Sequence, residues 1–289
     1  MSDAFNLTSL AEKIRQADGA LRSEAAEAGP LIRKYEATAL DFCHRLIAIT
    51  RVVVTEKRAL LPDNGWPVIV ASLFTKMVST VRAAHTLASA GHGREVSLVV
   101  RSALEALITA IFIAKQDSAL RARRWAQYAD VQRAALLRKN PDPALRDPQH
   151  RVERRRLLAR ARRNKRHFPN KSFWASGLRR GSLRDLAEDV GMLWHYDVVY
   201  WSGSQATHAN AIAVENYVVV SPDRGPLFQL GPSVKHLGAE LVVCCELLVR
   251  GLYLLNGLCG LQLEELLTDL RKEYVEALDN DRPSAAAPW

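Results

Sequence analysis

The sequence predicts a mainly α-helical protein, a bundle of about eight helices with one short β-hairpin near residues 214–230. Two observations predict this class. Alanine, leucine and arginine are abundant, and all three favour helix. Apolar residues also recur at helical spacing in most segments, and Gly or Pro separates one segment from the next. With 289 residues, 48% of them hydrophobic, the chain can bury a full core as one large domain or two small ones.

Three helices are expected in the first third of the chain. Residues 4–28 form a polar amphipathic helix that Gly29-Pro30 ends, and a longer helix follows at residues 31–60. The turn Pro62-Asp-Asn-Gly65 leads to a third helix at residues 66–90, whose first turn tolerates Pro67.

The middle of the chain continues with the most hydrophobic helix, at residues 94–115, and with a helix at residues 119–139 for which Asp117-Ser118 offers an N-cap. Residues 151–166 form a strongly basic helix, and residues 167–181 are expected to be a loop. Ser182 caps the next, short helix, because Asp185 stands at the capping-box position.

The last part of the chain begins with residues 213–231, which predict a small β-hairpin lying against helices. Two more helices follow at residues 232–258 and 261–278. The predicted organisation is an N-terminal helical region at residues 1–60, a main helical domain at 65–279 and a mobile tail at 280–289.

Several classes are disfavoured. The stretch Val96 to Ala114 is interrupted by Arg101 and Glu105, which predicts a buried helix and no membrane span. The N-terminus lacks a signal pattern, so we expect a cytoplasmic protein with free thiols at its four cysteines. No Walker loop, dinucleotide fingerprint or zinc spacing occurs, and we therefore expect no cofactor and no metal.

Positive charge is concentrated in one segment. Residues 121–184 hold 20 Lys and Arg against 4 Asp and Glu, whereas the whole chain has a net charge of only +9. This excess indicates a polyanionic partner. We expect nucleic acid, RNA more than DNA, with an acidic protein partner or mere solubility as the alternatives. The expected contacts are cationic side chains of the basic helix and one nearby aromatic: Arg151, Arg154, Arg155, Arg162, Arg163, Arg166 and Trp174. Whether the protein forms a homodimer is left open by the sequence.

Two polar stripes carry the candidate chemistry. Tyr200, Ser204 and His208 recur at four-residue spacing, and Arg101 with Glu105 has the same spacing in the most hydrophobic helix. Our central inference is that the two stripes meet inside the helical core. Arg101 and Glu105 then form either a structural ion pair or a positioned cation for a phosphate. His208 is likewise either a satisfied interior histidine or a general base.

These motifs resemble a widespread bacterial all-helical family of unknown function. The resemblance rests on Arg101-x-x-x-Glu105, on Phe173-Trp174 followed by Ser182-Leu-Arg-Asp-Leu-Ala, and on Tyr200-x-x-x-Ser204-x-x-x-His208, over residues 65–230. It implies a helical bundle with converging polar residues and no assigned reaction. More loosely, the chain resembles the HEPN superfamily of helical RNases, which use Arg-x4–6-His on one helix. Here Ser or Gly precedes His208 at those spacings, and the formal match from Arg162 to His167 lies in a run of arginines.

Two functions follow as hypotheses. The first is a nucleic-acid-directed bacterial effector, a metal-independent endoribonuclease of HEPN-like logic. Arg101 would hold the scissile phosphate, His208 would act as acid and base, and Tyr200, Ser204 and Glu105 would orient them. The alternative is a non-catalytic binding or regulatory module whose interior polar cluster is structural.

Overall fold

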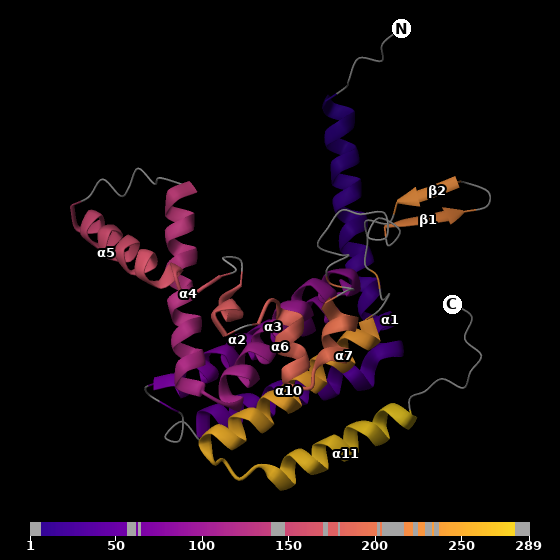
Figure 1. Cartoon of the computed structure of the whole chain (residues 1–289). Helices are drawn as coiled ribbons and strands as arrows, with labels where there is room; N and C mark the ends of the chain where they lie inside the picture. Colours follow the sequence, from indigo (N-terminus) through magenta and orange to yellow (C-terminus); the bar gives the residue numbers. More distant parts are fainter. Residues whose placement is uncertain are drawn as a thin grey trace.

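The computed structural model describes residues 7–56, 62, 65–139, 148–169, 173–178, 180–200, 203, 217–221, 225–228, 233 and 237–280. Over these residues the chain is a helical bundle whose only paired strands form one short hairpin, which confirms the all-α prediction. Figure 1 shows the bundle, with α4 and α5 extending from it at one end.

Three apolar helices form the centre of the bundle: α2 (Gly65–Ser89), α3 (Gly93–Lys115) and α10 (Leu237–Cys259). α3 packs most extensively on α2, and both pack on α10 (Figure 1). Met77, Leu107 and Leu248, one from each helix, are fully buried. By length and composition alone, each of these helices is apolar enough to cross a membrane. In the structure 67% of the most apolar stretch of α3 is buried within the molecule.

The N-terminal helix α1 (Leu7–Glu56) differs from the prediction in where it is interrupted. Pro30 does not end it; the backbone leaves helical geometry at Glu36 instead, with φ −128° and ψ 16°. A proline removes one hydrogen bond but has a φ suited to helix, so a long helix can absorb it. A Cβ on Gly238 would lie 2.5 Å from Glu36 Oε2, so the carboxylate abuts the first turn of α10, where the helix dipole favours negative charge. The second half of α1 then packs on α10 and α2.

The basic part of the chain forms a helical hairpin of α4 (Ser118–Lys139) and α5 (Pro148–Lys165) (Figure 1). The segment that we expected to be a loop contains a 3₁₀ helix at Trp174–Leu178, which packs on α4. α6 (Leu183–Asp189) follows with the predicted capping box: Ser182 Oγ accepts from the Asp185 N–H at 3.3 Å, and Asp185 Oδ2 accepts from the Ser182 N–H at 3.0 Å.

The segment around Tyr200 is not the regular α-helix that we expected. α7 (Leu193–His195) leads directly into a π-helical turn at Tyr196–Tyr200. The predicted hairpin is confirmed as β1 (Val218–Ser221) and β2 (Gly225–Phe228), paired antiparallel with Val218 opposite Phe228. The last helix, α11 (Glu264–Asn280), packs on α10 and α1. The predicted division into an N-terminal region and a main domain stays a prediction.

Candidate functional site

Arg101 and Glu105 form an ion pair along one face of α3. The distance from Arg101 Nε to Glu105 Oε1 is 3.5 Å, and the two side chains are 20% and 41% exposed. Because both residues belong to one helix and the carboxylate is open to solvent, the pair alone does not clamp neighbouring helices. An exposed pair at this spacing contributes little to stability.

The contact that joins α3 to the later segment is made by Tyr200. Its ring lies 3.9 Å from the Arg101 guanidinium carbon, in cation–π geometry. The Tyr200 ring also stacks on Tyr196, with 4.5 Å between centroids and 18° between planes. Burial, and then the neighbouring Tyr200, raise the pKa of Tyr196 to about 12, so its phenol stays protonated at neutral pH. Arg101, Tyr200 and Tyr196 are therefore one continuous stack.

Gly203 allows this close approach. A Cβ at this position would lie 2.9 Å from the Ser97 carbonyl oxygen and 3.0 Å from Arg101 Cβ, so only glycine fits here without a shift. Ser204 and His208, the other members of the predicted stripe, lie outside the described residues. The two stripes thus meet at Arg101 and Tyr200, and the roles assigned to these residues stay predictions.

A cavity of about 590 Å³ opens beside the stack. We call it the aromatic cavity, because six of its lining residues are aromatic: Trp125, Tyr128, Phe173, Trp174, Tyr196 and Tyr200. Polar groups lie at its wall as well, among them Lys76 from α2, Glu105 from α3, Gln132 from α4 and Ser182 at the start of α6. A largely apolar cavity with a few convergent polar groups is typical of a ligand site.

Each wall of the aromatic cavity is held by packing. Trp174 is 6% exposed and meets Phe112 edge-to-face at 5.8 Å between centroids, which fixes the 3₁₀ helix on the core. Phe168 is likewise buried and packs edge-to-face on Tyr128. The capping box holds Ser182, and the Gly181 N–H, which donates to Asp185 at 2.7 Å, is the main cause of the lowered pKa of that carboxyl group.

Trp174 lies away from the surface of the basic helix, and its predicted contact with nucleic acid stays a prediction. We expected this ring to stack on bases beside the basic helix, but it faces the core and the aromatic cavity, and it is not part of the α5 surface. Sequence reasoning also missed Lys76 and Trp125. Trp125 stands three residues before Tyr128 on α4, a helical spacing that could have marked a shared face.

The expected phosphate contacts lie on the α4–α5 hairpin. Most of the predicted cations are exposed along α5 and just beyond its end, namely Arg151, Arg155, Arg162, Arg163 and Arg166, while Arg154 is half-buried. Arg160 pairs with Asp130 of α4 at 3.2 Å, which ties the two helices together. A smaller cavity of about 380 Å³ lies between the helices and is lined mainly by arginines, including Arg133 and Arg156.

α4 contributes to both sites. Gln132 lines the aromatic cavity, and the next residue, Arg133, lines the arginine-rich cavity between α4 and α5. A ligand that entered the aromatic cavity would therefore lie one helix away from the cationic surface.

Three of the cysteines form a buried cluster, in which hydrogen bonds from Cys244 and Cys245 lower the pKa of the Cys43 thiol to about 4. Cys43, Cys244 and Cys245 are buried with free thiols, and Cys259 is half-buried. Within the described part of the chain, no group of three or more His, Cys, Asp or Glu side chains is placed to hold a metal ion.

A family model described as "Family of unknown function (DUF5677)" matches residues 68–226. Every lining residue of the aromatic cavity, from Ser72 to Tyr200, falls within the matched range. No curated protein and no solved structure matches the chain.

Proposed function

The chain belongs to the family of unknown function DUF5677. Because the family assigns no activity, the function has to be inferred from the site, and we propose that the protein binds single-stranded nucleic acid, RNA in preference to DNA. One unpaired base would occupy the aromatic cavity, and the flanking phosphates would lie on α4 and α5. The observation that carries this proposal is the position of α4, which forms a wall of the aromatic cavity with Trp125 and Gln132 and a wall of the arginine-rich surface with Arg133.

The chemistry of the aromatic cavity suits a base. Every base has a π-face, and stacking on an aromatic side chain contributes about 1–3 kcal/mol per base. Trp125 is half-buried at the cavity wall and offers such a face, whereas the two faces of the Tyr200 ring are covered by Arg101 and Tyr196. Lys76 is a donor, Glu105 an acceptor and Gln132 both, so the edge of a stacked base can be hydrogen-bonded as well.

The surface beside the cavity suits phosphates. Residues 121–184 carry 20 basic against 4 acidic side chains, and the arginines of α5 are mostly exposed. Unpaired RNA bases splayed onto aromatic side chains, with phosphates on arginines, are the common mode of RNA recognition by proteins. An acidic protein partner would use the same arginines but has no need of the aromatic cavity.

The test is fluorescence anisotropy with a labelled single-stranded RNA, the same DNA sequence and an RNA duplex. Trp125→Ala should weaken RNA binding by about 5- to 150-fold, because it removes one stacking face, while Trp125→Phe retains most of the affinity. The melting temperature of each variant is measured in parallel, because Trp125 also packs on the core.

Charge reversal tests the phosphate surface separately. The double variant R162E/R163E on α5 should weaken binding and reduce the slope of log K against log salt by about 1.4, because two phosphate contacts are lost. The control is R271E/K272E on α11, which changes the charge equally on exposed residues far from α4 and α5 (Figure 1). Equal loss in the two double variants, or no loss with Trp125→Ala, would refute the proposal.

Cleavage is the second candidate function, and the contact of Arg101 with Tyr200 at the rim of the cavity favours it. Arg101 would stabilise the charge on a scissile phosphate, and His208 would move the proton of the 2′-hydroxyl. His208→Ala should then abolish cleavage of bound RNA in the presence of a chelator without weakening binding. If the RNA stays intact after prolonged incubation with the wild-type protein, the cleavage hypothesis is refuted and the non-catalytic binding module remains.

A further inference from the structure

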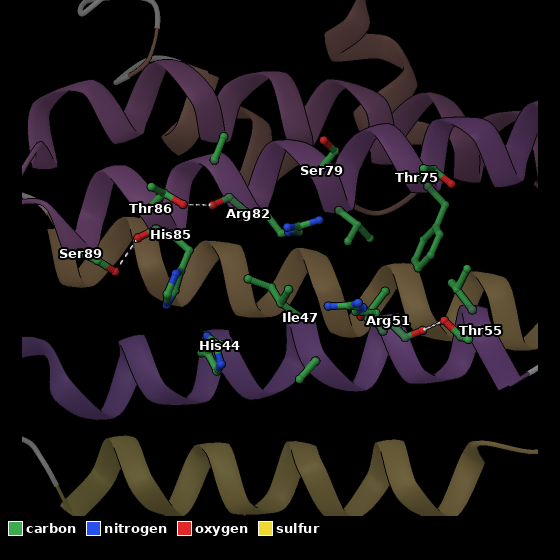
Figure 2. A pocket seen from close by; sticks show the side chains of 16 residues that line it. His44, Ile47, Arg51, Thr55, Thr75, Ser79, Arg82, His85, Thr86 and Ser89 are labelled. Atoms are coloured by element: carbon green, nitrogen blue, oxygen red, sulfur yellow. Dashed lines mark hydrogen bonds between the residues drawn. The ribbon is translucent and has the colours of Figure 1, made fainter.

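A second and larger cavity runs between α1 and α2, in the region that Figure 2 shows. Its volume is about 1060 Å³, and we call it the cationic groove. Both walls are held by α10, since α1 and α2 each pack on that helix. Its wall on α1 extends from His44 to Thr55, which at the rise of an α-helix is about 16 Å. Because α1 precedes residue 68, this wall lies outside the family-matched range.

The charged groups of the groove all have one sign. Arg51 from α1 and Arg82 from α2 reach into it from opposite walls, and His44 and His85 face each other at one end, 5.6 Å between ring centroids (Figure 2). No Asp or Glu is among the residues that line it. Neither guanidinium forms an ion pair with any residue in the described ranges.

The hydroxyl groups of the groove strengthen its preference for an anionic ligand. Thr55, Thr75, Thr86 and Ser89 each donate to the carbonyl four residues earlier, at 2.8 to 3.0 Å. Their protons are thus used within the helices, and their lone pairs remain to accept hydrogen bonds. The strong donors offered to a ligand are therefore the arginines and the histidines. They select a ligand rich in acceptors, and the hydroxyl oxygens suit a ligand that also carries hydroxyl groups.

Apolar side chains complete the groove. Ile47 and Val54 from α1 and Val78 from α2 are half-buried at its wall, and Phe74 of α2, only 2% exposed, lies behind them. A ligand with a planar or apolar body can bury it here while its anionic end meets the guanidinium groups. The volume lies slightly above the range of about 300–1,000 Å³ that is typical of small-molecule sites.

We propose that the cationic groove binds a soluble phosphate-bearing molecule of nucleotide size. Arg51 and Arg82 hold its phosphates from the two sides, because guanidinium groups bind phosphate oxygens in bidentate fashion. Thr and Ser oxygens accept from its hydroxyl groups, and its body lies on the half-buried side chains of Ile47, Val54 and Val78. This site is separate from the α4–α5 surface and does not depend on RNA binding.

The experiment is isothermal titration of the full chain with ADP and with inorganic pyrophosphate. Both should bind, ADP the more tightly because its body fills the apolar part of the groove. The double variant R51A/R82A should weaken both by about 10-fold or more. The affinity of R51K/R82K should lie between those of the wild type and R51A/R82A, because lysine keeps the positive charge but lacks the paired N–H groups of a guanidinium. Both arginines are exposed, so folding should be unaffected, and a melting curve checks this.

The matched control is R271A/K272A, which removes two exposed cations from α11 and should bind both probes like the wild type. RNA affinity should be unchanged in R51A/R82A, which separates this site from the proposed RNA surface. Absence of binding at millimolar ADP and pyrophosphate, or equal affinity in R51A/R82A, overturns the proposal. Binding only to phosphatidic acid vesicles, dependent on both arginines, also overturns it and assigns the groove to a lipid headgroup.

Discussion

Replacement of Gly203 by alanine tests the contact on which the candidate site depends. The added methyl group would lie 2.9 Å from the Ser97 carbonyl oxygen, 3.0 Å from Arg101 Cβ and 3.3 Å from Arg101 Cδ. The carbonyl belongs to the backbone of α3 and cannot rotate away, so the segment that carries Tyr200 has to shift. Overpacking of this kind costs about 1–3 kcal/mol. At about 2–4 °C per kcal/mol for a chain of this class, the melting temperature should fall by about 2–12 °C.

Gly257 provides the matched control within the same chain. It lies on an exposed face of α10, and a Cβ there would have no atom within 4 Å. Gly257→Ala should therefore stabilise the helix by about 0.5–1 kcal/mol, because alanine loses less backbone entropy on folding. The assay is thermal unfolding followed by circular dichroism. If Gly203→Ala melts as high as the wild type, or higher, the described approach of Gly203 to α3 is wrong.

Three further predictions concern single groups. Glu105→Gln should cost at most about 0.5 kcal/mol in chemical denaturation, because the pair with Arg101 is a partly exposed pair on one helix; a larger cost would show a structural role. The Gly181 N–H lowers the pKa of Asp185 in the folded state, so this carboxylate stabilises the protein above the ordinary Asp pKa near 4, and the contribution is lost as pH falls through the folded pKa. Asp185→Asn should thus be less stable at pH 7 and lose less stability on acidification, and parallel pH profiles would contradict this. Since the pKa of Tyr196 is about 12, absorbance titration at 295 nm of Tyr196→Phe should overlay the wild type up to about pH 10.5. If Tyr196→Phe shows less phenolate absorbance than the wild type below that pH, Tyr196 titrates there and the buried stack is wrong.

Helix positions followed directly from the sequence where local signals were strong. α3 and α6 begin within one residue of the predicted positions, because Gly91-His-Gly93 and the Ser182 capping box act locally. The hairpin was found for the same reason, since the turn residues Ser221-Pro-Asp-Arg-Gly225 lie between a valine run and the apolar pair Leu227-Phe228. At Pro30 a local signal was misleading, because the break in α1 falls at Glu36, where the side chain meets the distant first turn of α10.

The candidate site was predicted only in part. The meeting of Arg101 with Tyr200 was inferred from spacing, but the π-helical turn changes the angle between successive residues and was not foreseen. The position of Trp174 differs from the expected one, because an aromatic beside arginines in the sequence gives no sign of whether it faces solvent or core. Lys76 and Trp125 were missed because they come from separate helices, and only tertiary packing brings them to one cavity.

The double duty of α4 has a mechanical consequence. Among the larger helix contacts, α5 packs on α4 alone, while α4 itself rests on α2 and α3. Any force that tilts α4, whether a ring inserted next to Trp125 or a strand pulling on the arginines, must move the cavity wall and the charged arm together. If both proposed sites bind one strand, a shift of α4 would couple them directly, because the same helix forms part of each.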